Sequence, residues 1–231
     1  ELTPIVAGFS NSNFYMLIAG VAISALMLIG MQPRARVPGR LQSLAEVSYE
    51  FIYGLVRDQI GHEGKKFFPF VFTLFMFILF GNMLGMLPYA FTFTSHIAVT
   101  FTLALVVFIL VTAVALAIHG LHFFSYFFPE GAPKALAPLI IPIEIISYLS
   151  RVVSLSVRLF ANMVAGHVML KVFATFIVMM GGAGAIGLLG ALAPLAINVA
   201  LVGFEFLVAF LQAYVFAVLT CIYLHDAVHL H

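Results

Sequence analysis

A single positive charge in the middle of a long apolar segment is the first feature of this chain that could do chemistry. Arg158 lies within Ser154 to Lys171, SLSVRLFANMVAGHVMLK. A charged side chain at bilayer depth costs roughly 2.5 to 3.5 kcal/mol on insertion scales, so it usually faces protein or water and marks an ion path. Because a guanidinium stays protonated at ordinary pH, Arg158 can hold a fixed positive field but cannot relay protons. We therefore expect Arg158 to act as a gate.

Two stripes of polar residues accompany this charge. The first follows intervals of three and four residues, which place it on one face of a helix: Glu144, Ser147, Arg151, Ser154, Arg158 and Asn162. The second lies on the next apolar segment in a seven-residue register: Asn198, Glu205, Gln212 and Asp226. A polar stripe on a lipid-immersed helix requires a polar or wet neighbour, so both are candidate parts of one site.

The glycine-rich stretch Gly181–Gly187 predicts a turn between the two segments, which are then antiparallel. Counting outward from this turn predicts three facing pairs: Arg158 with Gln212, Glu144 with Asp226, and His167 with Glu205. Polar groups would then meet at three levels of the helix pair.

The pair of His167 and Glu205 is the candidate proton relay. The two groups can exchange a proton near neutral pH, because an imidazole titrates at about 6.5. The alternative is a static hydrogen-bonded pair that holds two helices together. Since both residues lie on the far side of Arg158 from the basic loop described below, we prefer a path from the outside. Glu144, with Asp226 and His225, would stand at the opposite mouth, where ordinary interfacial solvation is the alternative.

Composition places these residues in a membrane protein. Of 231 residues, 64% are hydrophobic and 8% charged, whereas soluble domains carry about 25% charged residues. A net charge of +1 and scattered basic residues disfavour nucleic acid. The single Cys221 can form no internal disulfide, and no zinc-type spacing is present. A haem site would need facing histidines within the membrane, but most of the candidates sit at segment ends: His96, His119, His122, His229 and His231. We therefore expect no cofactor and no metal.

We expect residues 1–231 to form a single all-α membrane domain with about five membrane helices and one amphipathic surface helix. The predicted ranges are 13–31 for the first span, 41–60 for the surface helix, 67–87 and 95–118 for a hairpin, and 138–180 and 184–228 for two channel helices. The first apolar run is of full span length, so we interpret it as a true span and not a signal-peptide core. Asn82, in the hairpin, is interpreted as a residue that holds two helices together by hydrogen bonding; the alternative is that it lines a polar path.

Charge distribution predicts the orientation. The polar stretch 32–66 holds six of the ten basic residues, so by the positive-inside rule it is cytoplasmic, or matrix-side in a mitochondrion. The N-terminus is then outside and the C-terminus inside. The polar connection predicted between 119 and 138 is cytoplasmic as well.

The last two segments are too long for ordinary spans. At about 1.5 Å per residue each would be a helix of roughly 60 Å, twice the roughly 30 Å of the hydrocarbon core. We expect both to lie strongly tilted and to wrap a neighbouring curved surface, with ordinary spans carrying interfacial extensions as the alternative.

SLSVRLFANMVAGH and the later FEFLVAFLQAYVFAVLTCIYL resemble subunit a of the F-type ATP synthase, the stationary proton-channel subunit beside the rotating c-ring. GNMLGMLP and PIEIISYLSR are similar to that family too, so the resemblance covers most of the chain from about Leu41 onward. It implies that Arg158 matches the family's essential arginine and that Asn162 and Gln212 match its polar neighbours. It also implies c-ring subunits, peripheral-stalk b subunits, other ATP synthase subunits and membrane lipid as partners.

Two departures refine the resemblance. Many bacterial members have an acid where His167 stands and a histidine where Glu205 stands, so the pair is exchanged here; Gly85 stands where some members have an acid. The pattern resembles the alphaproteobacterial or mitochondrial branch, which implies a bacterial inner membrane, with the mitochondrial inner membrane as the alternative.

The chain has no phosphate-binding loop and is not expected to be an enzyme on its own. Two other classes fit the sequence less well. A proton- or sodium-coupled secondary transporter would be expected to show an internal repeat, and no clear repeat is found. A structural anchor would have no reason to bury Arg158 and Glu205.

Overall fold

The computed structural model describes residues 4–6, 9–32, 38–87, 90, 92–120, 123, 137–182 and 184–229. The helices are α1 (Asn11–Met31), α2 (Arg40–Ile60), α3 (Phe68–Gly85), α4 (Ile97–His119), α5 (Ala137–Gly181) and α6 (Gly184–Val228), with the short 3-10 helices η1 (Gly61–Lys66) and η2 (Phe93–Ser95). The predicted all-α class is confirmed. A short antiparallel strand pair before α1, β1 (Pro4–Val6) and β2 (Phe9–Ser10), was not expected. The connection predicted between 119 and 138 lies largely outside the described residues.

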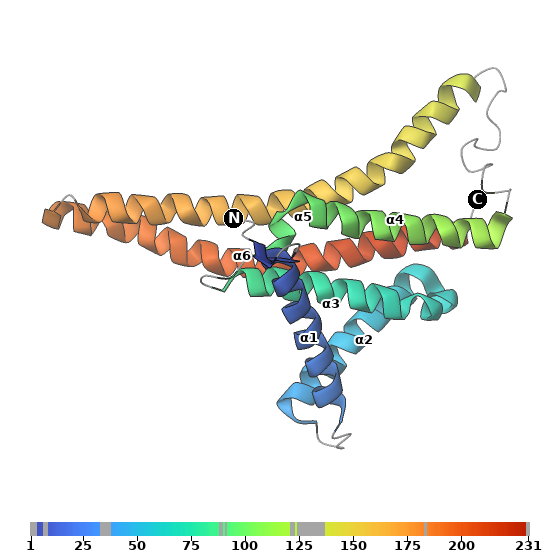
Figure 1. The fold of residues 1–231 in the computed structure, drawn as a ribbon, viewed down its shortest axis with the longest axis horizontal. Helices are drawn as coiled ribbons and strands as arrows, with labels where there is room; N and C mark the ends of the chain where they lie inside the picture. Colours follow the sequence, from blue (N-terminus) through green and yellow to red (C-terminus); the bar gives the residue numbers. More distant parts are fainter. Residues whose placement is uncertain are drawn as a thin grey trace.

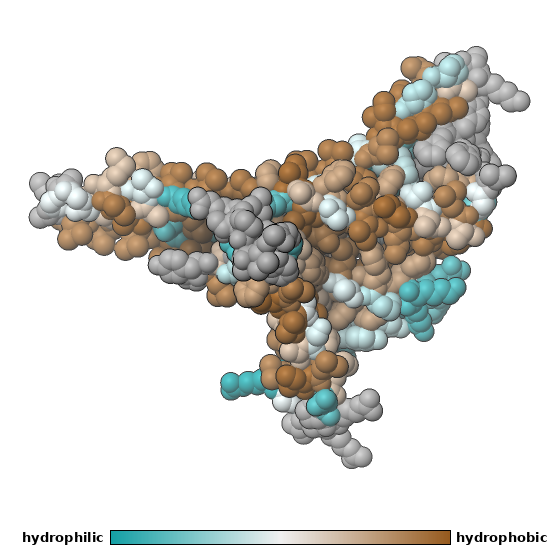
Figure 2. Space-filling model, viewed as in Figure 1, coloured by the Kyte–Doolittle hydropathy of each residue, from teal (hydrophilic) through white to brown (hydrophobic). Residues whose placement is uncertain are grey.

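Five of these helices are long and apolar enough to cross a membrane: α1, α3, α4, α5 and residues Gly187–Val228 of α6. Figure 2 shows a mainly hydrophobic surface, with hydrophilic side chains gathered over the end of α2 and η1. The amphipathic α2 leaves apolar side chains uncovered, since Leu41, Leu44 and Val47 are all more than half exposed. An exposed apolar stripe of this kind suits a helix that lies on a lipid surface.

The two longest helices, α5 and α6, form the antiparallel pair that was predicted (Figure 1). Each has 45 residues, which corresponds to about 68 Å of helix. Gly184 begins α6 with a φ of +82°, a backbone conformation that glycine adopts without steric cost. The first part of α5 diverges from α6, whereas its later part runs beside α6 up to the turn (Figure 1).

Small side chains allow α3 to pack closely against α6. Ala209, Ala213 and Ala217 recur every four residues on α6 and are fully buried, which lets neighbouring backbones approach. Asn82 of α3 donates a hydrogen bond of 3.2 Å to the backbone carbonyl of Ala209. This contact is the interhelical role that we expected for Asn82, and it fixes α3 against the middle of α6.

Candidate functional site

Arg158 opens onto a cavity of about 470 Å³ between α5 and α6. Its polar lining residues are Arg158, Asn162, Glu205 and Gln212. The Arg158 side chain is exposed, and among the described residues it forms no ion pair with a carboxylate. A fixed positive charge therefore faces an open, otherwise apolar groove, where it is available to an anion outside this chain.

Asn162 and Gln212 connect the two helices beside this charge. The Asn162 side-chain amide donates a hydrogen bond of 2.6 Å to Gln212 Oε1. Gln212 is 3% exposed, and its Nε2 has no hydrogen-bond partner among the described residues. Arg158 and Gln212, which were expected to face each other, line the same groove. The direct contact with Gln212 is made by Asn162, one turn farther along α5.

The predicted pair of His167 and Glu205 is brought together. His167 Nδ1 lies 3.4 Å from Glu205 Oε1. Glu205 is 4% exposed, yet neither of its carboxylate oxygens has a hydrogen-bond partner within the described part of the chain. The carboxylate fits because Gly166 has no side chain: a Cβ there would lie 2.5 Å from Oε1. A buried carboxyl group without donors is suited to gaining and losing a proton through a titratable neighbour such as His167.

A second cavity, of about 480 Å³, lies on the other side of this pair. It is lined by residues of α3, α5 and α6 and of the segment around η2, among them Gly85, Thr92, His96, His167, Lys171 and Glu205. Glu205 and Leu170 line both cavities, and Glu205 is the titratable one of the two. The sequence did not predict Thr92, whose Oγ1 lies 2.7 Å from His167 Nε2.

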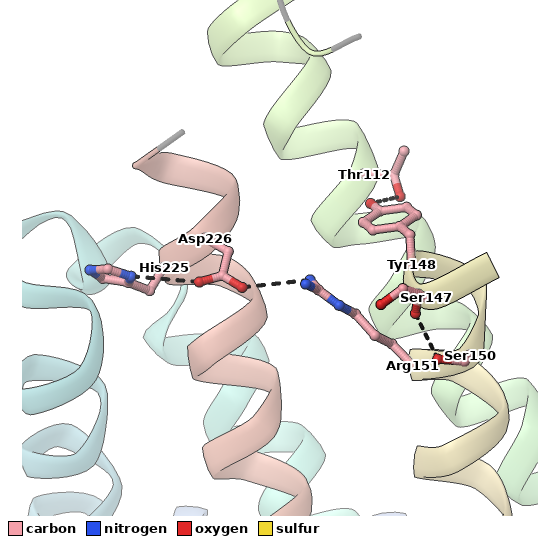
Figure 3. A network of polar contacts seen from close by, with 7 residues as sticks. All are labelled: Thr112, Ser147, Tyr148, Ser150, Arg151, His225 and Asp226. Atoms are coloured by element: carbon pink, nitrogen blue, oxygen red, sulfur yellow. Dashed lines mark hydrogen bonds and ion pairs between the residues drawn. The ribbon is translucent and has the colours of Figure 1, made fainter. Parts of the chain in front are cut away.

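A separate polar cluster joins the first part of α5 to the end of α6 (Figure 3). Arg151 Nη1 lies 3.6 Å from Asp226 Oδ2, and the Arg151 guanidinium stands over the rings of Tyr148 and Tyr223 at 5.5 and 5.0 Å. His225 Nδ1 lies 3.9 Å from Asp226 Oδ1. The predicted facing of Glu144 with Asp226 is therefore wrong in register, since the ion pair of Asp226 is with Arg151, seven residues farther along α5.

The reason for this shift is the shape of the helix pair. Counting from the turn assumes that both helices advance equally and stay parallel. The first part of α5 instead diverges from α6 (Figure 1). The residues that contact each other therefore depart further from the predicted pairs as the distance from the turn grows. The predicted pairing holds at His167 and is wrong at Asp226.

A family model described as ATP synthase A chain matches residues 13–225. The chain belongs to this ATP synthase subunit a family. ATP synthase subunit a of Granulibacter bethesdensis is 68% identical over 98% of this chain and 90% of its own length. That of Acidiphilium cryptum is 60% identical over 96% of this chain and 89% of its own, and that of Rhodospirillum rubrum is 52% identical over 100% and 93%.

These relatives come from alphaproteobacteria, the branch that the exchanged His167 and Glu205 indicated. Membership in the subunit a family makes the chain a multi-pass membrane protein, the proton-channel subunit of the ATP synthase membrane sector, and gives it other ATP synthase subunits as partners. The family assignment accounts for the buried polar residues better than a secondary transporter does.

Proposed function

We propose that this subunit carries protons through two half-channels to and from carboxylates on a rotating ring of c subunits. The observation that carries the proposal is the exposed, unpaired guanidinium of Arg158 in the groove between α5 and α6. A carboxylate on a ring subunit is the anion that such a groove would receive at membrane depth. Arg158, Asn162 and Gln212 then form the contact with the ring.

The outer half-channel is the second cavity, which leads to His167 and Glu205. A proton that reaches Glu205 passes to the cavity that Arg158 lines, since Glu205 lines both. Protonation lets the ring carboxylate leave the arginine and turn into lipid. Loss of that proton on the other side restores an anion that is attracted to Arg158, whose field also blocks a direct leak.

The inner half-channel opens near the first part of α5 and the end of α6. Glu144 and Asp226 stand there as the proposed exit groups, and Arg151 holds Asp226 in place. A proton that crosses the whole path releases about 2.3 kcal/mol for each 100 mV of membrane potential.

The wider setting follows from the same proposal. The partners are the c-ring and the peripheral-stalk b subunits, in a bacterial inner membrane, and residues 1–231 act as a single membrane domain. The subunit supplies a proton path and a fixed charge, and it performs no bond-making chemistry itself.

A crosslinking experiment on the intact ATP synthase tests this arrangement. Leu211 lines the Arg158 groove and is 44% exposed, so Leu211→Cys in a Cys221→Ala background should crosslink to a small hairpin subunit. Leu28→Cys on α1, at a position 66% exposed, is the matched control and should not. Crosslinking of the ring to Leu28→Cys and not to Leu211→Cys would overturn the proposal that the groove faces the ring.

A further inference from the structure

Thr92 connects the proton-carrying pair to the end of α3. Its hydroxyl group lies 3.0 Å from the backbone carbonyl oxygen of Gly85 and 2.7 Å from His167 Nε2. Thr92 is 6% exposed. Its own carbonyl accepts hydrogen bonds from both the amide and the hydroxyl of Ser95, so η2 holds the residue in position.

The directions of these two hydrogen bonds follow from what each atom can do. A backbone carbonyl can only accept, and a hydroxyl has one proton to donate. Thr92 donates that proton to Gly85, the last residue of α3, whose carbonyl is one of those left without a partner inside the helix. The hydroxyl oxygen must therefore accept from His167, and His167 Nε2 must carry a hydrogen.

We propose that Thr92 is a positioning residue that fixes the neutral His167 ring as the Nε2–H tautomer. The second nitrogen, Nδ1, then presents its lone pair to Glu205 Oε1, 3.4 Å away. The inference rests on the proposed proton path and names the atoms used in it. The exchange of a proton between His167 and Glu205 then takes place at Nδ1, and the ring does not need to turn over for it.

Two states of the pair follow, and they differ by one proton transfer. In one state Glu205 is a carboxylic acid that faces a neutral imidazole. In the other the O–H bond has broken, an Nδ1–H bond has formed, and a carboxylate faces an imidazolium; the total charge is the same. A charge-assisted hydrogen bond is about 2.7 to 2.9 Å long, so a small approach of the two side chains completes the contact.

The surrounding backbone is shaped for this arrangement. A Cβ at Gly85 would collide with the Oγ1 and Cβ of Thr92, and a Cβ at Gly166 would collide with the Glu205 carboxylate. The two glycines thus leave room for the outer members of one chain of contacts, which runs from the Gly85 carbonyl through Thr92 and His167 to Glu205.

Nitrogen-15 NMR of the histidine-labelled, membrane-reconstituted ATP synthase tests the tautomer directly. The His167 signals are assigned by their loss in His167→Gln. In the wild type, neutral His167 should show one protonated Nε2 and one unprotonated Nδ1. Thr92→Val, which removes only the hydroxyl group, should give a mixture of both tautomers, whereas Thr92→Ser should restore the single form. An unchanged tautomer in Thr92→Val would overturn the proposal.

Passive proton flux through the membrane sector supplies the functional readout. Thr92→Val should lower the flux roughly two- to tenfold, the worth of one ordinary hydrogen bond, and Thr92→Ser should recover most of it. Thr94→Val is the matched control, because Thr94 is buried like Thr92 but its hydroxyl has no partner among the described residues. The flux of Thr94→Val should equal that of the wild type. Equal losses in Thr92→Val and Thr94→Val would show a general packing effect and overturn the positioning role.

The tautomer and the proton path can fail separately. If Thr92→Val changes the tautomer while Glu205→Gln conducts normally, Thr92 positions a ring that is not part of the path, and the proposed function falls. If Glu205→Gln blocks conduction while Thr92→Val leaves the His167 tautomer unchanged, the proposed proton path is supported and the positioning role of Thr92 is contradicted.

Discussion

Asn162 on α5 donates a hydrogen bond of 2.6 Å to Gln212 on α6, one helical turn from the exposed guanidinium of Arg158. The bond ties the two long helices together at the level of the fixed charge. Arg158 is thereby held on a rigid wall of the groove, and the distance between this charge and an approaching carboxylate is set by the helix pair.

The first prediction concerns this register. Cysteines at Asn162 and Gln212, in a Cys221→Ala background, should form a disulfide with high yield under mild oxidation. Asn162 with Phe204 is the control pair, since Phe204 lines the same groove but lies eight residues away from Gln212, or about 12 Å along the helix. A higher yield for the control pair, measured on denaturing gels after proteolysis between the helices, would show that the register is wrong.

The second prediction concerns the fixed charge. Arg158→Ala should reduce coupled ATP synthesis to background while the assembled complex remains, because Arg158 forms no ion pair that would hold the described fold together. Arg158→Lys should be severely impaired too, since a lysine that the ring covers can lose its proton, and lysine lacks the planar fork. Synthesis is measured in inverted vesicles and normalised to the amount of assembled subunit. Normal ATP synthesis in Arg158→Ala would contradict the proposal that the charge of Arg158 acts as a gate.

The third prediction uses the space that Gly166 leaves. Gly166→Ala places a Cβ against the Glu205 carboxylate, and overpacking of this kind costs about 1 to 3 kcal/mol. We expect the carboxylate to be displaced and the passive proton flux to fall several-fold. Gly20→Ala on α1 is the control, because a Cβ there meets nothing within 4 Å. Equal flux in the two variants would show that the position of Glu205 does not matter.

Apolar length and helical period were sufficient to predict the six helices. The structure starts α1 two residues before the predicted 13 and ends it at the predicted Met31. α2, with its uncovered Leu41 and Leu44, fits the amphipathic pattern expected of a surface helix. These features depend on local sequence alone, which is why they could be read from it.

The contacts that depend on tertiary path could be predicted only near the turn. His167 contacts Glu205 almost as counting from the turn predicts, whereas the ion pair of Arg151 with Asp226 lies farther from the turn. Thr92 escaped prediction altogether, because it lies 75 residues from His167 in a connection without periodicity. A buried hydroxyl near a titratable group leaves no signal in a single sequence.

The last prediction separates a proton relay from a helix brace. Glu205→Gln and His167→Asn keep a similar shape but remove a titratable group, so a brace should tolerate them and a relay should not. The exchanged variant, His167→Glu with Glu205→His, retains one acid and one imidazole and should recover more conduction than the worse single change. If proton conduction in the exchanged variant is no higher than in the worse single variant, the two arrangements of the acid and the imidazole are not equivalent.

Passive proton flux through the membrane sector of Glu205→Gln, after removal of the catalytic head, tests the central claim most directly. Proton transfer by a positioned group is typically worth roughly a hundredfold or more, so the flux should fall at least about tenfold while the amount of assembled subunit is unchanged. Near-normal flux in Glu205→Gln would contradict the account and leave His167 and Glu205 as a contact that only holds α5 and α6 together.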